Sequence, residues 1–484
     1  MSSKRFAFKA VATAAIAAAG LCVVGQAHAA VTIIINNINA AGVGFNDPTP
    51  AAPVGGNTGT TIGQQRLNAF TYAANIWGAA LTSSAPVVIN AQFTPLSCTA
   101  TGGVLGSAGA TQVFRDFANA LPSPAPKPST WYSFALANKI AGSDLGSPAG
   151  SPQINSNFNS NLGTPGCLET SGWYYGFDGN EGTKIDFVAV LQHEMAHGLG
   201  FQTFTQGSTG AFFSGFPAIW DHFLFSVAAG KNWVTATSAE RVASAISVSG
   251  LVWNGPIVNA AAPLVLATLP VVVISGTAAG AAAGTYASGE AIFGPLPTLA
   301  GVTGTVMPVS EQTAGAGPGC ETFSAANALA VNNRIALIAR GTCGFVVKVK
   351  NAQNAGALGV IISDNVSAPI SGLGGSDPTI TIPAVRVTLE TGNAIRAQLS
   401  SRSRSRSGVV ASITRDPTQT AGLGSGGRVL MFAPNPFQGG SSVSHYDTSA
   451  SPNLLMEPSI NGDLTQLVGP PRDLTLPLFT EIGW

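Results

Sequence analysis

The sequence predicts an α+β protein in which a smaller, mixed α/β domain interrupts a larger domain. Three observations predict this arrangement. The chain has 484 residues, more than one ordinary core accommodates. A helix-then-strand pattern opens the chain, and a β-α-β pattern with its own apolar residues begins near Val271. After a serine- and arginine-rich stretch at 400–407 the first composition returns, so we expect the larger domain at 30–265 and 416–484 and the inserted domain at 266–415.

Charge and hydropathy exclude several classes of protein. Only 9% of the residues are charged and the formal net charge is zero, so we expect no basic surface for nucleic acid or an anionic membrane. The mean hydropathy of +0.30 raises the question of a membrane span. The best internal candidate, Ala260–Ile274, is shorter than the roughly 20 residues that a span needs and contains two prolines. We expect a buried strand and linker there, and no span in the mature chain.

The N-terminus has the pattern of a secretory signal peptide at residues 1–29. Three basic residues precede the apolar run Ala10–Val24, and the small residues Ala27–Ala29 offer a cleavage site. The mature protein is therefore predicted to be secreted, either outside the cell or into a periplasm.

The mature chain has an even number of cysteines in this oxidising route. They are Cys98, Cys167, Cys320 and Cys343, which allow three pairings. We favour the disulfides Cys98–Cys167 and Cys320–Cys343, one in each predicted domain. The alternative is four free, buried thiols.

Helix and strand patterns follow the signal peptide in the first region. Apolar residues recur at helical spacing along Gln64–Leu81, and Val87–Phe93 follows as a strand. The stretch to Gly182 is rich in glycine, serine, asparagine and proline, which is typical of loops and short strands. Asp186 is then a suitable N-cap for a helix at Phe187–Gly198.

The second region has an apolar pattern of its own. Val331–Arg340 is predicted to be a strand, Phe345–Ala355 a helix and Leu358–Asp364 a second strand. The stretch "SSRSRSRS" at 400–407 alternates arginine with serine. This pattern is more typical of an exposed strand edge or loop than of a binding segment.

The stretch Leu191–Phe201, "LQHEMAHGLGF", contains H-E-x-x-H, the pattern of hydrolytic zinc sites. On a helix, His193 and His197 project from one face one turn apart, so both imidazoles can bind one zinc ion. Glu194 stands beside them, where it can take the proton of a zinc-activated water and later deliver it to a leaving amine. Gly200 permits a positive φ that ends the helix and turns the chain back below the metal. The alternative is a helix whose two histidines are satisfied by hydrogen bonds in the core.

A catalytic zinc needs a third protein ligand, and few residues can supply it. Where H-E-x-x-H-x-x-G patterns usually place a third histidine, this chain has Thr203, a poor ligand. Of the five histidines, one lies in the signal peptide and two in the motif. We favour His445 as the third ligand and keep as alternatives His222, the aspartate Asp221 and the glutamate Glu240.

The stretches "HEMAHGLGF" and, after a long insertion, "SHYD" and "LLMEP" resemble the leishmanolysin-type metzincins, in which an inserted segment also delays the third histidine. The resemblance implies a metzincin-type zinc protease domain, with a twisted sheet and the active-site helix in a large upper part. A small lower part would hold His445, Met456 in a tight turn below the zinc, and a C-terminal helix. One departure is Pro458, at the position where some metzincins have a tyrosine; Tyr446 is nearby without an assigned role. The resemblance covers roughly Gln64–Trp77, Trp173–Phe204 and Gly439–Trp484.

The inserted domain resembles the protease-associated (PA) domain. The stretch "ALIARGTCGFVVKVKNAQNAGALGVIISDN" at 336–365 carries the resemblance, which extends over about Val271–Ala411. Such domains carry no catalytic residues. The resemblance implies that this one gates the cleft or captures substrates, although it could be a spacer.

Together these features predict a secreted zinc metalloendopeptidase that hydrolyses peptide bonds in protein substrates. One catalytic zinc would lie on His193, His197 and His445, with Glu194 as the general base. An extended substrate would pair with an edge strand before the active-site helix, for which Ile154–Asn159 is a candidate. The alternative is an exported binding or adhesion protein on the same scaffold, without catalysis, but such a protein would not need Glu194. A zinc hydrolase of non-peptide amides also fits the motif, and the sequence predicts no oligomeric state.

Overall fold

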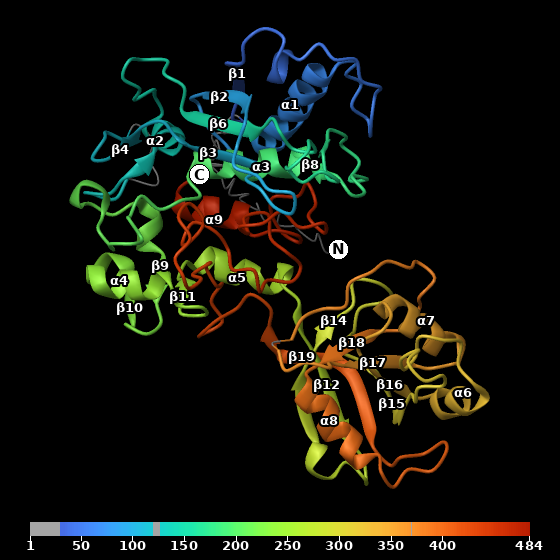
Figure 1. Ribbon diagram of the computed structural model, residues 1–484. Coiled ribbons are helices and arrows are strands. Elements are labelled where there is room, and N and C mark those ends of the chain that lie inside the picture. Colours follow the sequence, from blue (N-terminus) through green and yellow to red (C-terminus); the bar gives the residue numbers. More distant parts are fainter. Residues whose placement is uncertain (1–29, 120–125, 369) are drawn as a thin grey trace, which may run out of the picture.

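The computed structural model describes residues 30–119, 126–368 and 370–484. The predicted signal peptide at 1–29 lies outside the described residues. The described chain forms two units joined by two adjacent segments (Figure 1). We call them the first unit, residues 30–266 and 421–484, and the second unit, residues 267–420.

A four-stranded sheet lies at the top of the first unit in Figure 1. Its strands, in spatial order, are β1 (Ile33–Asn37), β2 (Val87–Thr94), β6 (Ile154–Asn159) and β3 (Gly106–Ala110). The first three strands are parallel, and β3 runs antiparallel at the edge. Buried and half-buried residues alternate along β2, which confirms the strand predicted from the period-two pattern.

The interior position of β6 shows that one prediction was wrong. Ile154–Asn159 pairs with β2 on one side and β3 on the other, so it offers no free edge to a substrate. The edge strand next to β6 is β3, whose sequence GSAGA lacks the β-branched and aromatic residues that mark strands. Only its pairing with β6 makes it a strand, and the sequence pattern could not reveal that.

Two helices pack on this sheet and on each other, α1 (Ile62–Ala80) and α3 (Phe187–Leu199). Helix α1 agrees with the predicted helix within two residues at its start and one at its end. The Thr61 side chain caps it by accepting a hydrogen bond from the Gln64 amide at 3.2 Å. The buried face of α1 includes Phe70 and Trp77.

The rest of the first unit consists of short elements and the C-terminal helix. They are β4 (Val113–Phe114), β5 (Tyr132–Ser133), α2 (Phe134–Ala141), β7 (Trp173–Tyr174), β8 (Ile185–Asp186), β9 (Leu224–Ser226), β10 (Lys231–Asn232), α4 (Ser238–Ala245), β11 (Leu251–Trp253), α5 (Pro256–Val265) and α9 (Thr475–Ile482). Helix α9 is the C-terminal helix that the resemblance implied. One core joins the two chain segments: the rings of Trp77 and Phe479 lie 5.1 Å apart, as do those of Phe201 and Tyr446.

Helix α5 corrects the prediction of a strand and linker at Ala260–Ile274. Its first residue is Pro256, a residue whose fixed φ suits the first turn of a helix. Val258, Ala262 and Val265 then recur at helical spacing and are buried against the core of the first unit. The second half of the stretch is a strand, β12 (Thr268–Ser275), as predicted.

The second unit is built on an eight-stranded sheet. In spatial order the strands are β13 (Gly284–Ala287), β12, β19 (Val410–Thr420), β15 (Val302–Pro308), β16 (Ile335–Ala339), β17 (Gly359–Ser363), β18 (Ala384–Val387) and β14 (Gly289–Glu290). Strands β15 to β18 are parallel. Helix α6 (Ala325–Val331) connects β15 to β16, α7 (Phe345–Asn354) connects β16 to β17, and α8 (Leu389–Gln398) lies between β18 and β19 in the chain.

Two apolar clusters cover the two faces of this sheet. Ala336 and Ile338 belong to the cluster with α6 and α7, while Ile335 and Leu337 face the cluster with α8. The helix and second strand of the predicted β-α-β pattern are confirmed as α7 and β17. The first strand was predicted too long, because Val331 ends α6 and Asn333 has a φ of 56°, outside the extended region.

Both predicted disulfides are confirmed, Cys98–Cys167 in the first unit and Cys320–Cys343 in the second. The Cα atoms are 5.1 and 5.7 Å apart in the two pairs. Among the described residues, no helix has both the length and the hydropathy needed to cross a bilayer.

Candidate metal centre

Helix α3 presents two histidines on one face because both of its ends are well defined. At the start, Asp186 Oδ1 accepts a hydrogen bond from the Val188 amide at 2.8 Å, as predicted for an N-cap. At the end, Gly200 has a φ of 128°, and its amide donates to the carbonyls of Ala196 and His197. The turn predicted at this glycine is therefore present.

Three histidine side chains converge at this helix. The Nε2 atom of His197 is 3.1 Å from Nε2 of His193 and 3.2 Å from Nε2 of His445. The third separation, between His445 and His193, is also 3.2 Å. All three side chains are buried, with 5–9% of each residue exposed. A residue almost 250 positions away in the chain thus completes the pair on the helix.

Backbone carbonyls orient all three rings. The Nδ1 atom of His193 lies 2.8 Å from the Leu455 oxygen, and that of His197 lies 2.8 Å from the Phe201 oxygen. His445 Nδ1 lies 2.7 Å from the Ser441 oxygen. A carbonyl only accepts, so each Nδ1 carries the ring proton and each Nε2 offers a lone pair to the shared space.

Electrostatics favour neutral rings in this position. Burial lowers the pKa of His193 to about 4 and that of His197 to about 3, and it holds the pKa of His445 well below its usual value. Three neutral imidazoles with lone pairs facing one another cannot hydrogen-bond among themselves. Such a donor set fits a cation, and His₃ is an established ligand set for catalytic zinc.

Glu194 lies between the histidines and strand β3. The residue is 6% exposed, and its carboxyl group is hydrogen-bonded to the Ala108 amide of β3. Burial raises the pKa of Glu194 to about 8. A Cβ atom at Gly106 would lie only 2.9 Å from Glu194 Cγ and Oε1, so the glycine lets the edge strand approach this side chain.

A tight turn around Met456 follows Leu455, whose carbonyl meets His193. The Glu457 amide donates to the Leu454 carbonyl at 3.2 Å, and the buried Met456 carbonyl accepts from the Tyr446 amide at 2.8 Å. The Tyr446 hydroxyl is buried and donates to the Leu474 carbonyl at 3.0 Å, so this side chain belongs to the core.

Asp473 was not singled out from the sequence, yet it holds this turn. Its Oδ2 atom accepts from the Leu455 amide at 2.7 Å, and its Oδ1 atom accepts from the Thr475 amide at 2.7 Å. Because the Leu455 carbonyl orients His193, Asp473 acts on the histidines through a single residue, whose amide it binds and whose carbonyl meets the ring. Backbone partners leave no mark in a sequence, so only the fold could show this link.

The alternative third ligands all have other partners. His222 Nε2 lies 3.0 Å from Thr130 Oγ1. Asp221 accepts hydrogen bonds from the hydroxyls of Thr203 and Thr205 and from the Ala218 amide. Glu240 caps α4 and is paired with a lysine on the surface. Within the described residues, His193, His197 and His445 are the one group of three side chains placed to hold a metal.

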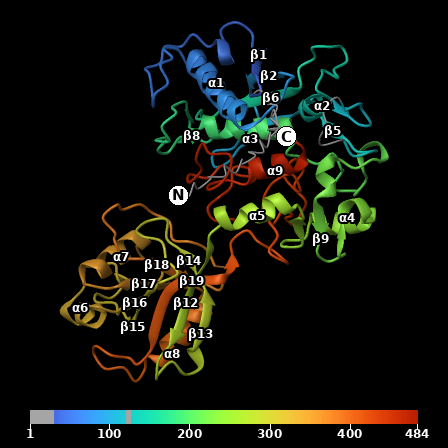
Figure 2. The same ribbon diagram turned by 180° about the vertical axis from the view of Figure 1, so that it is seen from behind.

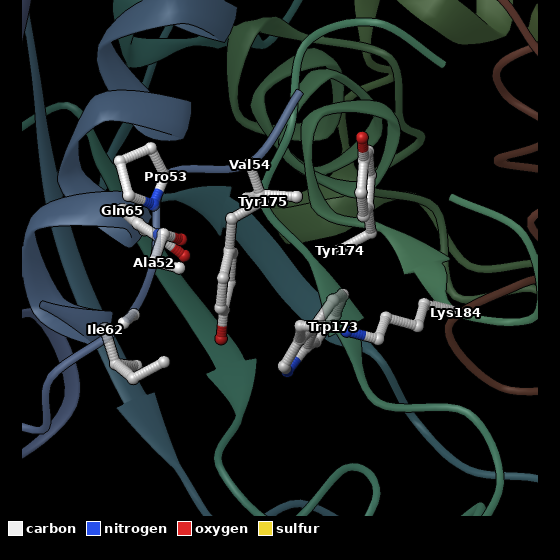
Figure 3. A pocket seen from close by; sticks show the side chains of 10 residues that line it. Ala52, Pro53, Val54, Ile62, Gln65, Trp173, Tyr174, Tyr175 and Lys184 are labelled. Atoms are coloured by element: carbon white, nitrogen blue, oxygen red, sulfur yellow. The ribbon is translucent and has the colours of Figure 1, made fainter. Parts of the chain in front are cut away.

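A hollow of the first unit lies away from the histidines, beside α1 and β7 (Figure 3). It has a volume of about 340 Å³ and is lined by Pro53, Ile62 and the aromatic run Trp173–Tyr175, among others. The polar tips of these aromatic residues are already bonded: Tyr175 to Arg66, Tyr174 to Asp178, and the Trp173 indole to the Asn159 carbonyl. This hollow contains none of the histidines.

Comparison with known proteins identifies one domain of the chain. Residues 302–395 match the model of the PA domain, so a PA domain is present in the second unit. A probable lipoprotein aminopeptidase, LpqL of Mycobacterium tuberculosis, is 35% identical over 99 residues, which are 20% of this chain and 19% of that protein. The minor extracellular protease Vpr of Bacillus subtilis is 30% identical over 69 residues, 14% of this chain and 8% of that protein.

The structural similarity is of the same limited extent. A zinc aminopeptidase from Bacillus subtilis matches with 23% identity and a TM-score of 0.21, covering 34% of this chain and 37% of that chain. This chain spans less than a fifth of the length of the curated relatives described above.

Proposed function

We propose that this protein is an exported zinc endopeptidase of the leishmanolysin-like metzincin type. The observation that carries the proposal is the set of three Nε2 atoms within 3.2 Å of one another, each on a ring whose Nδ1 is committed to a carbonyl. The sharp turn at Gly200 and the turn around Met456, which adjoins the carbonyl that orients His193, support the metzincin assignment. The PA domain, a kind of domain found beside peptidase sites, supports a protein substrate.

His193, His197 and His445 would hold one zinc ion. When bound, zinc supplies a Lewis acid that polarises the scissile carbonyl and makes water a nucleophile at neutral pH. The three Nδ1–carbonyl hydrogen bonds keep the ligand nitrogens aimed at one point, so little reorganisation is needed on binding.

Glu194 is the proton carrier of the proposed reaction. Burial favours the protonated carboxyl, but a cation held by the three histidines would favour the ionised form. This carboxylate would accept the proton of the attacking water and deliver it to the amine that leaves when the peptide bond breaks. The Ala108 amide and the close approach of Gly106 hold the carboxyl between the edge strand and the histidines. Burial keeps bulk water away from this proton.

Strand β3 is the proposed platform for the substrate, in place of β6. It has a neighbour on one side only, and its backbone lies against Glu194. An extended peptide added to that edge would run past the carboxyl group and continue in both directions. This geometry favours cleavage inside a chain over removal of an N-terminal residue.

The PA domain is proposed to gate or capture substrates near this site. The Ala267 amide, at the start of the second unit, donates to the Ser451 carbonyl at 2.6 Å. The Ser451 hydroxyl in turn lies 3.4 Å from Glu290 of the same unit. Ser451 stands between His445 and Met456 in the chain, so movement of the second unit would act directly on the third histidine's segment.

The test is the zinc content of the purified mature chain beside His445→Ala and His222→Ala. We expect about one zinc per chain in the parent and in His222→Ala, and little or none in His445→Ala. Loss of zinc from His222→Ala alone would contradict the proposal. A parent that binds no zinc when it is supplied would favour the binding-protein alternative.

The mode of cleavage needs a separate assay. A long peptide with an acetylated N-terminus, analysed by mass spectrometry, should be cut at an internal bond by the parent. If only the unblocked peptide is shortened, one residue at a time, the protein is an aminopeptidase and the proposed substrate platform is wrong.

A further inference from the structure

A loop at 399–409, which we call the arginine loop, lies at the end of the second unit that is remote from the first unit. Strands β12 and β19 pair from Thr268 and Thr420, at the junction with the first unit, to Ser275 and Val410. The arginine loop leads directly into Val410. Eight residues of strand, at roughly 3.3 Å each, place the loop about 26 Å from the junction. Figures 1 and 2 both show the loop after α8 at the end of the second unit that is farthest from the first unit.

This end of the molecule carries uncompensated positive charge. Residues 391–415 contain five arginines and no aspartate or glutamate. Of the five, Arg415 is paired with Glu290 near the junction, but none of the other four forms an ion pair with any described residue. Arg402, Arg404 and Arg406 are exposed.

The charge of the whole chain is divided in the same way. Residues 267–420 contain ten lysines and arginines against seven aspartates and glutamates, whereas residues 30–266 and 421–484 contain nine against fifteen. A formal net charge of zero therefore hides a positive second unit beside a negative first unit, and the expectation of no basic surface was wrong because a net charge says nothing of where the charges lie. The excess on the second unit is concentrated at its far end.

A groove opens next to the arginine loop. It has a volume of about 220 Å³ and is lined by Pro308, Ser310, Arg396, Leu399, Ser400 and Arg402. The Arg396 guanidinium donates one hydrogen bond to Ser363 Oγ, and that of Arg402 donates one to the Leu399 carbonyl. Each guanidinium has five N–H donors, so most of them remain for a ligand. Glu311 follows the lining residue Ser310 in the chain, but its carboxylate accepts a hydrogen bond from the Gly317 amide at 2.8 Å.

We propose that the groove and the arginine loop bind an anionic polysaccharide, a sugar polymer that bears sulfate or carboxylate groups. A guanidinium binds an oxyanion through two parallel hydrogen bonds, and serine hydroxyls between the arginines can donate to the same groups or to sugar hydroxyls. No large apolar side chain of the described residues 399–409 is exposed, so the loop offers nothing to insert into a lipid surface. Held at this end, the protein would keep its first unit free above an anionic matrix.

The experiment measures binding of the full mature chain to immobilised dextran sulfate and to alginate, with neutral dextran as the blank, at about 50 mM NaCl. Binding to at least one anionic polymer and not to dextran is expected. If the three arginines of the loop release three counterions from the polymer, the logarithm of the binding constant should fall with the logarithm of the salt concentration with a slope of about −2. Affinity should therefore fall about 100-fold at tenfold higher salt. The variant Arg402→Ser/Arg404→Ser/Arg406→Ser should bind at least about 10-fold more weakly.

A matched control removes three positive charges elsewhere, Lys184→Ser/Lys231→Ser/Lys350→Ser. It should bind as the parent does, and thermal unfolding should show that both variants are folded. The proposal is overturned if neither polymer binds, if the arginine variant binds like the parent, or if the lysine control loses as much affinity. Stronger binding to phosphatidylglycerol vesicles or to polyglutamate than to both polysaccharides would also overturn it. None of these outcomes depends on zinc or on proteolysis.

Discussion

Asp473→Asn isolates the part of the site that the sequence did not reveal. The carboxyl of Asp473 is 2% exposed and accepts two backbone hydrogen bonds, from Leu455 and Thr475. Asparagine has one acceptor oxygen, so its NH₂ group must face one of these two N–H groups. A buried donor left without an acceptor costs about 1–3 kcal/mol, and the free energy of unfolding of the metal-free protein should fall by that amount.

The same substitution is expected to weaken zinc binding. The Leu455 carbonyl orients His193 at 2.8 Å, and the amide of the same residue would lose its fixed partner. Changes in groups that orient metal ligands typically cost 10–100-fold in metal affinity, which is about 1.4–2.8 kcal/mol. Chelator competition measures the zinc dissociation constant, and urea unfolding in the presence of EDTA measures the stability of the metal-free protein.

Asp377→Asn in the second unit is the matched control. Asp377 also accepts hydrogen bonds from a neighbouring amide and hydroxyl, both of Thr379, but it is only half-buried and lies in the other unit from the histidines. The zinc affinity of the Asp377→Asn variant should equal that of the parent. If Asp473→Asn loses stability and keeps the parent's zinc affinity within about twofold, the chain of contacts from Asp473 through Leu455 to His193 does not orient the ligand, and the reasoning is refuted.

Three further predictions follow from the same site and its surroundings. Glu194→Gln should abolish hydrolysis of casein and keep about one zinc per chain; normal turnover in this variant would refute its role as the general base. Gly198→Ala should lower the free energy of unfolding by about 1–3 kcal/mol, because a Cβ there would lie 2.4 Å from Ile154 Cγ2. Urea unfolding checks this, and the double variant with Ile154→Ala should cost less than the sum of the two single changes. Burial raises the pKa of Glu457 from 4.5 to about 8, so unfolded chains ionise first, and the free energy of unfolding should fall as pH rises through this interval. Glu457→Gln should reduce that slope, to which Glu194 contributes in the same direction, and an unchanged pH profile of urea unfolding would contradict the assignment.

The elements that the sequence predicted well are those specified by near neighbours. Helix α3 begins after Asp186 and ends at Gly200, through contacts within four residues. Asp186 has the side chain that an N-cap needs, and Gly200 has the backbone freedom that the C-terminal turn needs. The strand β2 and the helix α7 follow from apolar periodicity alone. The two disulfides follow from an even cysteine count and from pairing within each predicted domain.

The elements that the sequence predicted poorly depend on a partner elsewhere in the chain. The edge strand β3 consists of glycine, alanine and serine, which have low strand propensity, and exists as a strand through its pairing with β6. The stretch before β12 has an apolar run that fits a strand or a helix equally well. Packing against the first unit's core makes its first part the helix α5.

The sequence by itself determined the chemistry available at the candidate site: two histidines and a glutamate on one helical turn, two further histidines and a methionine far along the chain. It could not decide where those distant groups lie, since contacts across an insertion of this length have no local signature. The tertiary structure brings His445 to within 3.2 Å of the other two histidines and leaves His222 bonded to Thr130. It also brings the carbonyls of Leu455, Phe201 and Ser441 to the rings that they orient. The sequence could not show this, because every residue carries the same backbone oxygen and only the fold selects which ones meet a histidine.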